Sequence, residues 1–205
     1  MKYDFTTLVD RSELSSSKWE SMKGKGRELP KGIVPFSVAD MEFKTPSKIT
    51  EGLKDYLTDS ILGYANPSKA YYDAICNWMK KRHGYEVNRE RIATTPGVVC
   101  AIHLAIECFS KADENVLIMA PSYPPFFHAV EDCQRKLLVN NLVLKDGHYE
   151  IDFEDFEAKA KDPKTTMFIL CSPHNPTGRV WKKEELERIA QICLENHVFV
   201  VADEI

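Results

Sequence analysis

The sequence predicts an α/β fold in which a doubly wound, mostly parallel sheet carries helices on both faces and follows an N-terminal arm. Four strand–helix repeats succeed one another along the chain, which is the order expected of parallel α/β folds. The run Val198–Ala202 is apolar on both faces, as in a strand buried within a parallel sheet. Loops that contain two or three prolines end the apolar runs 115–120 and 165–171 abruptly.

Composition excludes several classes of function. The 205 residues carry a formal net charge of −4, which gives no electrostatic basis for binding nucleic acid or an anionic membrane. No apolar run approaches the roughly 20 residues of a membrane span, and Met1–Phe5 lacks the apolar core of a signal peptide. The six cysteines lack C-x-x-C spacing, so we expect free, buried thiols in a cytoplasmic protein. The histidines lack metal-ligand spacing, so no metal site is expected.

The first part of the chain is predicted to hold an arm and two helices. Residues 1 to about 45 contain many turn formers and little periodicity, which indicates an extended arm. Thr45-Pro46-Ser47 begins a helix, and Asn66-Pro67 opens another that ends in Lys80-Lys81-Arg82. Tyr64 lies beside a glycine in the loop between these helices.

The segment Ile92–Gly97 is predicted to be a strand followed by a glycine at the start of a helix. Val98 and Val99 begin the apolar face of that helix. A helix N-terminus offers free backbone N–H groups to an anion, although most such turns hold none. The chain contains neither the P-loop pattern nor G-x-G-x-x-G, so a nucleotide site has no support.

The middle of the chain alternates between strands and helices. A strand at Asn115–Ala120 ends in the loop Pro121–Phe126, which contains Tyr123. The elements expected after this loop are a helix to about Gln134, a strand over 136–144, a turn at Asp146-Gly147 and a helix over 152–161.

The most informative stretch is the last strand–loop–helix–strand unit. The apolar run Thr165–Cys171 breaks into Ser172-Pro173-His174-Asn175-Pro176-Thr177-Gly178, where two prolines and a glycine forbid helix and strand. A helix over 182–196 leads to the strand that ends at Asp203. Polar side chains then lie at the carboxyl ends of two parallel strands, where open α/β sheets bind ligands. Taken alone, Asn175 is a turn residue and Asp203 a helix N-cap. Together they favour a ligand site.

The stretch Ser172–Gly178, followed by Val201-Ala202-Asp203-Glu204-Ile205, resembles the pyridoxal-phosphate enzymes of the aspartate aminotransferase fold (fold type I, class I/II aminotransferase superfamily). The resemblance is greatest to the cystathionine β-lyase (C–S lyase) branch of the MalY/PatB type, and His174 favours this branch. It implies that Asn175 hydrogen-bonds the ring oxygen of the cofactor and that Asp203 pairs with the protonated pyridine nitrogen. A carboxylate at that place keeps the ring an electron sink.

The same resemblance implies further cofactor contacts. Gly97, Val98 and Val99 would donate backbone amides to the phosphate. Tyr123 would stack on the pyridine ring; the alternative is ordinary packing within its loop. Tyr64 would reach the phosphate bound by a partner subunit, which implies a homodimer; the alternative is a tyrosine packed on the surface.

The stretch Val38–Phe43 resembles the part of the lyase branch that lines the substrate entrance. Asp40 and Met41 would then lie near the substrate, and the alternative for Asp40 is a solvated loop. The resemblance also implies two regions. Residues 1–45 would form an arm or small-domain segment, and residues 46–205 the front part of the large cofactor-binding domain.

The resemblance covers essentially the entire chain but only the front half of the family's length. The family's Schiff-base lysine lies beyond Ile205, so no catalytic residue is expected within this chain. The small domain, with its carboxylate-binding arginine, is likewise expected beyond it. We therefore expect residues 1–205 to be a portion of a longer polypeptide, also because a buried strand such as Val198–Ala202 seldom ends a natural domain.

For the whole protein, the resemblance implies a pyridoxal 5'-phosphate-dependent C–S β-lyase. It would convert cystathionine or cysteine-type amino acids into a thiol, pyruvate and ammonia. One alternative is an aminotransferase, which shares the steps up to the carbanion. The other is a non-catalytic fragment or protein-binding module, favoured if the 205-residue chain is the natural product. The expected partners are an amino-acid substrate and a second copy of the chain, without nucleic acid or membrane.

Overall fold

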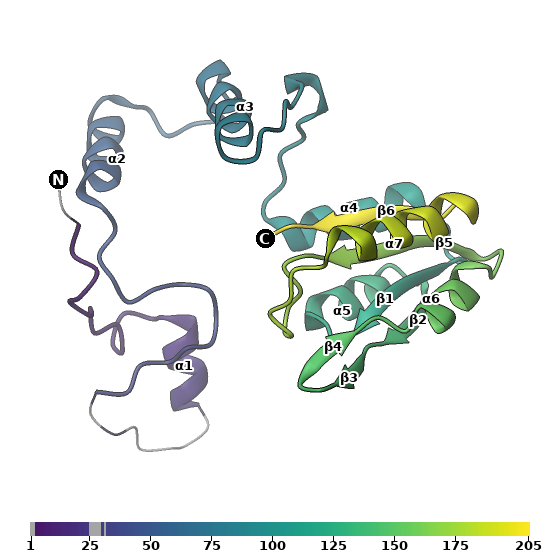
Figure 1. Ribbon diagram of the computed structural model, residues 1–205. Coiled ribbons are helices and arrows are strands. Elements are labelled where there is room, and N and C mark those ends of the chain that lie inside the picture. Colours follow the sequence, from purple (N-terminus) through teal and green to yellow (C-terminus); the bar gives the residue numbers. More distant parts are fainter. Residues whose placement is uncertain (1–2, 25–29, 31) are drawn as a thin grey trace. The chain divides into compact units, whose positions relative to one another are not determined.

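The computed structural model describes residues 3–24, 30 and 32–205. The chain divides into two compact units, residues 1–74 and residues 75–205, and helix α3 (Lys69–His83) contains the boundary between them. Figure 1 colours the chain from its N-terminus to its C-terminus. The boundary near residue 45 that the sequence suggests stays a prediction.

The first unit contains helices α1 (Ser17–Lys23) and α2 (Ser47–Asp59). The expectation of an arm that is extended throughout residues 1–45 is therefore wrong at α1, and residues 1–2, 25–29 and 31 of this arm lie outside the described residues. The side chains of Lys18 and Trp19 in α1 are buried. Helix α2 begins directly after Pro46, as the sequence predicts, and none of its side chains is buried.

The second unit is built on a four-stranded parallel sheet with the order β2-β1-β5-β6. Its strands are β1 (Asn115–Ala120), β2 (Lys136–Asn141), β5 (Thr165–Cys171) and β6 (Phe199–Asp203). Strands β1 and β5 match the predicted apolar runs, and both lie in the middle of the sheet. Strand β6 lies at the edge of this sheet, with Phe199 about half exposed.

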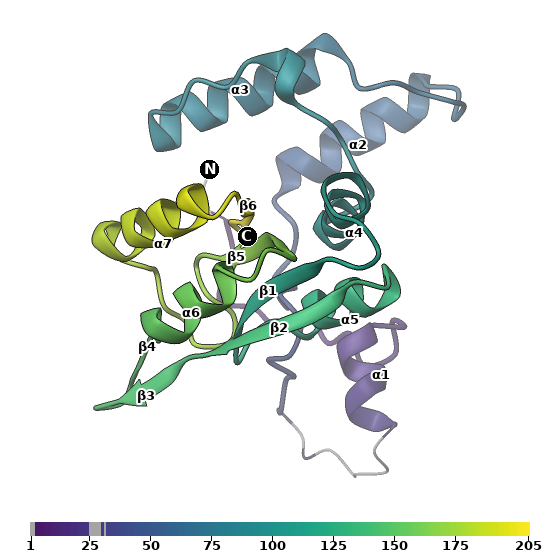
Figure 2. The same ribbon diagram turned by 90° about the vertical axis from the view of Figure 1, so that its right-hand side faces the viewer.

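Helices cover both faces of the sheet, as Figure 2 shows. Helices α4 (Val98–Phe109) and α5 (Pro124–Asp132) pack on the face that contains Val116 and Ile118. Helices α6 (Phe153–Ala160) and α7 (Lys183–Glu195) pack on the face that contains Leu117 and Met119. Because successive side chains of a strand point to opposite faces, a continuous apolar run fills both cores at once. The predicted doubly wound fold is confirmed.

Two predicted strands differ from the structure. Ile92–Thr95 follows a short 3-10 helix, η1 (Arg89–Arg91), and forms no strand, since it has no ladder partner within the described residues. The expected strand over 136–144 is broken at Leu142, which is buried. Beyond it, β3 (Val143–Lys145) pairs with β4 (His148–Glu150) as a separate antiparallel hairpin. Its turn is Asp146-Gly147, as predicted, with both residues at positive φ.

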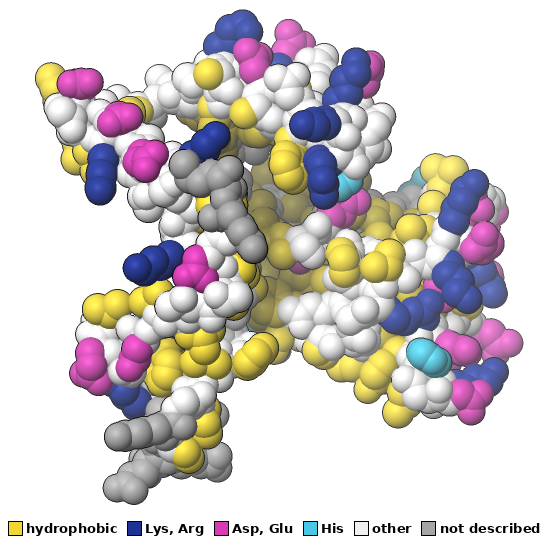
Figure 3. All heavy atoms as spheres, turned by 60° about the vertical axis from the view of Figure 1, so that its left-hand side comes forward, with side chains coloured by type: hydrophobic (Ala, Val, Ile, Leu, Met, Phe, Trp, Pro, Cys, Tyr) yellow, Lys and Arg dark blue, Asp and Glu magenta, His cyan; other side chains and the backbone are white. Residues whose placement is uncertain are grey.

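The surface is mixed in charge. On the face drawn in Figure 3, basic and acidic side chains are interspersed, and several form exposed ion pairs such as Lys161–Glu157. In the part of the chain that the structure describes, no helix has the length and apolar character needed to cross a membrane. All six cysteines are free. The expectation that they are buried holds for three of them, whereas Cys108 is exposed and the other two are intermediate.

Candidate active site

Three neighbouring strands have their carboxyl ends on the same side of the sheet. Ala120, Cys171 and Asp203 end β1, β5 and β6, which run parallel. Cys171 and Asp203 are direct partners in the β5–β6 register, and the backbone N–H of Ser172 donates to the Asp203 carbonyl at 2.9 Å. The half-buried Asp203 therefore lies beside the start of the loop that carries Asn175.

The sheet reverses its winding direction between β1 and β5. The β1–β5 ladder ends at the pair Ile118–Ile169, whereas β1 stays paired with β2 through Ala120 and β5 stays paired with β6 through Cys171. The chain passes from β1 to α5 on one face and from β5 to α7 on the opposite face. This is a topological switch point, where open α/β sheets bind ligands.

The loop Ser172–Gly178 is held closed by its own backbone. The N–H of His174 donates to the carbonyl of Arg179 at 2.6 Å, and the N–H of Gly178 donates to the carbonyl of His174 at 2.7 Å. Gly178 adopts a φ of +69°, a conformation that favours glycine. The closed loop leaves Asn175 exposed, with its backbone N–H 3.5 Å from the sulfur of Cys171. The loop that the two prolines and the glycine predict is present, with Asn175 exposed and His174 buried.

The side chain of His174 connects this loop to the loop after β1. Its Nε2 lies 2.8 Å from the carbonyl oxygen of Pro121, and only 1% of the residue is exposed. The ring packs edge-to-face on Trp181 at 5.2 Å. Sequence reasoning missed this contact, because nothing in the pattern around His174 indicates a partner 53 positions away.

Tyr123 follows Pro121 by two residues and is the N-cap residue of α5. Its ring packs edge-to-face on the buried Phe126 with the centroids 5.5 Å apart, and about a third of the residue is exposed. An aromatic face is thereby placed at the carboxyl edge of the sheet. Packing within the loop and a free face for a ligand are both compatible with this arrangement.

The N-terminus of α4 lies at the same end of the unit as the carboxyl ends of the strands (Figure 1). Gly97 precedes the helix with a φ of +97° and no atom within 4 Å of the place a Cβ would occupy. The first intrahelical bond runs from Ala101 to the Gly97 carbonyl, so the N–H groups of Val98 and Val99 have no acceptor within the helix. With the positive end of the helix dipole, they suit an anion.

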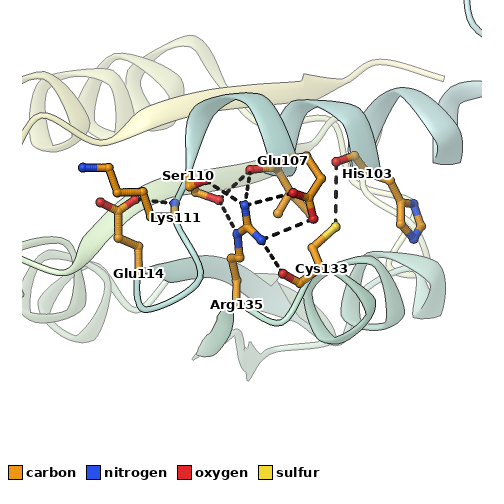
Figure 4. Close-up of polar contacts among 8 residues, drawn as sticks. His103, Glu107, Ser110, Lys111, Glu114, Cys133 and Arg135 are labelled. Atoms are coloured by element: carbon orange, nitrogen blue, oxygen red, sulfur yellow. Dashed lines mark hydrogen bonds and ion pairs between the residues drawn. The ribbon is translucent and has the colours of Figure 1, made fainter.

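Both ends of α4 are anchored. Near the N-terminus, Nδ1 of His103 donates to the carbonyl of Val99 at 2.9 Å, and its Nε2 lies 3.3 Å from Asp132. These contacts, first the Val99 carbonyl and then the Asp132 carboxylate, raise the pKa of His103. At the other end, Arg135 donates to the Ser110 carbonyl at 2.8 Å and pairs with Glu107 at 3.2 Å (Figure 4).

In the first unit, Asp40 and Met41 lie along a pocket of about 390 Å³. Asp40 is bound by Lys18 at 3.0 Å and by Arg11 at 2.8 Å, and these cations lower the pKa of its carboxyl group. The buried Lys18 also contacts the buried Glu42 at 2.5 Å, which raises the pKa of the lysine. Tyr64 is fully exposed.

The second unit thus places four predicted site features at one edge: Asp203, the Asn175 loop, Tyr123 and the start of α4. An anion site at a helix N-terminus, an aromatic face, an amide and a carboxylate together suit a flat ligand that carries a phosphate and a protonated ring nitrogen. Among residues 3–24, 30 and 32–205, no group of His, Cys, Asp or Glu side chains is arranged to hold a metal ion.

Comparison with known proteins assigns the chain to a family. The model of the family described as "Aminotransferase class I and II" matches residues 31–205. The chain belongs to this family. Among curated proteins, it is 49% identical to cystathionine beta-lyase PatB of Bacillus subtilis (strain 168), over 98% of this chain and 52% of that protein. It is 30% identical to protein MalY of Escherichia coli (strain K12), over 99% of this chain and 52% of MalY.

Solved structures also resemble the chain closely. Cystalysin from Treponema denticola, described as containing a pyridoxal 5'-phosphate cofactor, superposes with a TM-score of 0.95 at 44% identity, over 100% of this chain and 52% of cystalysin. A PLP-bound C–S lyase from Staphylococcus hominis gives a TM-score of 0.88 at 33% identity, over 99% of this chain and 51% of the lyase. The chain spans about half the length of the relatives it matches.

Proposed function

We propose that the whole protein is a pyridoxal 5'-phosphate-dependent C–S β-lyase that acts on cystathionine or cysteine-type amino acids. The observation that carries the proposal is the pairing of Asp203 with Cys171, which sets a carboxylate beside the Asn175 loop at the switch point. The 49% identity to PatB and the likeness to cystalysin support the lyase over other activities of the family.

In this proposal, the last residue of β6 and the loop after β5 hold the cofactor ring. Asp203 keeps a proton on the ring nitrogen through an ion pair, and Asn175 donates to the ring oxygen. When bound, the cofactor supplies an electron sink for the Cα–H bond that is broken and for loss of the thiolate from Cβ. Water then hydrolyses the unsaturated amino acid that remains, and the products are a thiol, pyruvate and ammonia.

The other contacts orient the cofactor. The N–H groups of Val98 and Val99, with Gly97 leaving room before the helix, bind the phosphate. Tyr123 stacks on one face of the ring. Tyr64, which is fully exposed in the first unit, contacts the phosphate held by a second copy of the chain, so the active form is a homodimer. Asp40 and Met41 line the substrate entrance.

The proposal leaves the proton-transfer lysine outside residues 1–205. We assign no lysine of this chain to the reaction. The free cysteines suit a reducing compartment, which we take to be the cytoplasm. The protein-binding alternative has no described feature that favours it over the enzyme.

The second candidate is an aminotransferase. It is favoured by the name of the matching family and by relatives such as the probable aspartate aminotransferase of Methanocaldococcus jannaschii, which is 29% identical over 84% of this chain. Both reactions need the same contacts from Asn175 and Asp203, and they differ in where the proton returns.

The test is a paired assay of the purified whole protein. With L-cystathionine as substrate, we expect equal amounts of pyruvate and ammonia without any keto acid added. In the parallel assay, transfer of the amino group to 2-oxoglutarate should be much slower. Amino transfer that depends on the keto acid, without pyruvate formation, would replace the lyase by the aminotransferase. The Asp203→Asn variant is the control for contaminating activity.

A further inference from the structure

The candidate site contains a gap that the sheet itself does not close. Strands β1 and β5 are paired only as far as Ile118 and Ile169, two residues before each strand ends. Beyond that pair, the two strand ends have no ladder bonds to each other in the described register. Their loops carry Tyr123 and Asn175. The distance between these two loops therefore determines the distance between the side chains of Tyr123 and Asn175.

The imidazole of His174 crosses this gap. Its Nε2 lies 2.8 Å from the Pro121 carbonyl oxygen. A carbonyl can only accept a hydrogen bond, so Nε2 carries the proton and donates it. The remaining nitrogen, Nδ1, is buried and has no partner among the described residues. The tautomer is therefore determined by one bond between the two loops.

Further contacts fix the backbone and the ring of His174 in place. Its backbone is bonded on both sides within the loop, to Arg179 and to Gly178. Its ring packs on Trp181, whose indole N–H donates to the Cys171 carbonyl at 2.8 Å. The ring is thus fixed relative to the end of β5.

We propose that His174 is a positioning residue that sets the separation between Tyr123 and Asn175. Asn175 directly follows His174 in the sequence. Tyr123 lies two residues after Pro121, whose carbonyl oxygen accepts the hydrogen bond from His174. The inference rests on the proposed function, since it gives this separation a role in holding the ring of pyridoxal 5'-phosphate. His174 itself touches neither cofactor nor substrate.

The first test compares two substitutions in the whole protein. His174→Gln can keep an N–H donor toward Pro121, whereas His174→Leu has a similar volume and no donor. We expect His174→Leu to weaken binding of pyridoxal 5'-phosphate by about tenfold and to shift the absorption maximum of the bound cofactor. His174→Gln should stay within about threefold of the unsubstituted protein. Thermal unfolding of both cofactor-free variants should differ little.

Equal effects of the two substitutions, or wild-type binding by His174→Leu, would overturn the inference. A loss of binding that only follows a loss of thermal stability would also overturn it, because that result indicates a purely structural role.

The second test needs no substitution. In protein labelled with ¹⁵N-histidine, we expect the His174 signals of the Nε2-protonated tautomer, and we expect these signals to move when pyridoxal 5'-phosphate is added. An Nδ1-protonated tautomer, or signals that stay in place at saturation, would contradict the inference even if the leucine variant does not fold. Absence of cofactor binding by the unsubstituted protein would instead refute the proposed function, while the tautomer still reports on the His174–Pro121 bond.

Discussion

The carbonyl of Asp203 accepts a hydrogen bond from the backbone N–H of Ser172 at 2.9 Å, although the two residues are 31 positions apart in the sequence. The bond continues the β5–β6 ladder beyond the pair Cys171–Asp203. It joins the backbone of Asp203, at the end of β6, to the first residue of the loop that carries Asn175.

Asp203→Asn should nearly abolish elimination in the whole protein. The amide keeps the shape of the side chain but cannot pair as an anion with a protonated ring nitrogen. Removal of a preorganised electrostatic group costs about 10²–10³-fold in kcat, and we expect a loss of at least this size. Steady-state kinetics measures the loss, and unchanged circular dichroism would show that the fold persists.

Asn175→Ala should be milder. It removes one hydrogen bond from an exposed side chain, which is worth about 0.5–1.5 kcal/mol, or about tenfold at most in kcat/KM. The same assay serves for both variants. If Asp203→Asn proved as mild as Asn175→Ala, the role assigned to Asp203 would be wrong.

Phe168→Ala should destabilise the second unit by about 3–5 kcal/mol. Phe168 is fully buried and packs edge-to-face on Phe156 with centroids 4.9 Å apart, so the truncation leaves a cavity between the sheet and α6. Chemical denaturation measures the change in unfolding free energy. Leu194→Ala on the exposed side of α7 is the control and should change it by less than about 0.5 kcal/mol. Similar losses in both variants would contradict the core assignment.

The protonated form of His103 should stabilise the fold. The Val99 carbonyl, and then Asp132, raise the pKa of His103 above its ordinary value of 6.5. A raised pKa gives stability that is fully present below pH 6.5 and is lost as the pH rises through the folded-state value. The denaturant midpoint should therefore decrease as the pH rises from 6.5 through the folded-state pKa of His103. His103→Gln should flatten this part of the profile, and an unchanged slope in that variant would refute the assignment.

Lys18→Met should loosen the first unit. The substitution removes the cation nearest to the buried carboxylate of Glu42. Lys18 lies 2.5 Å from this carboxylate, whereas the next cation, Arg11, lies 3.6 Å away. A buried carboxylate that loses its cation destabilises the fold, whereas a neutral side chain in place of the carboxylate does not carry this cost. Amide hydrogen exchange in α1 should become faster in this variant and recover in the double variant Lys18→Met/Glu42→Gln. Equally fast exchange in both would show that the ion pair is not what protects α1.

The local elements that the sequence determined by itself are those with strong patterns. The runs Asn115–Ala120 and Thr165–Cys171 had to be buried strands, because each is apolar on both faces and ends at a proline-containing loop. The turn at Asp146-Gly147 followed from its residue types. The motif around Asn175 and the acid at Asp203 pointed to the site through their resemblance to a family, and the matching family model bears out that membership.

Only the tertiary structure decided which segments meet. A strand needs a partner, and Ile92–Thr95 has none among the described residues, whatever its local propensity. Strand β2 ends before Leu142 because β1, its partner, ends at Ala120; the N–H of Leu142 still bonds to the Ala120 carbonyl at 2.7 Å. The His174–Pro121 bond exists because β1 and β5 became neighbours. Such contacts depend on which strands are neighbours in the sheet. The packing of both faces of the sheet determines this strand order, and no local pattern of residues encodes it.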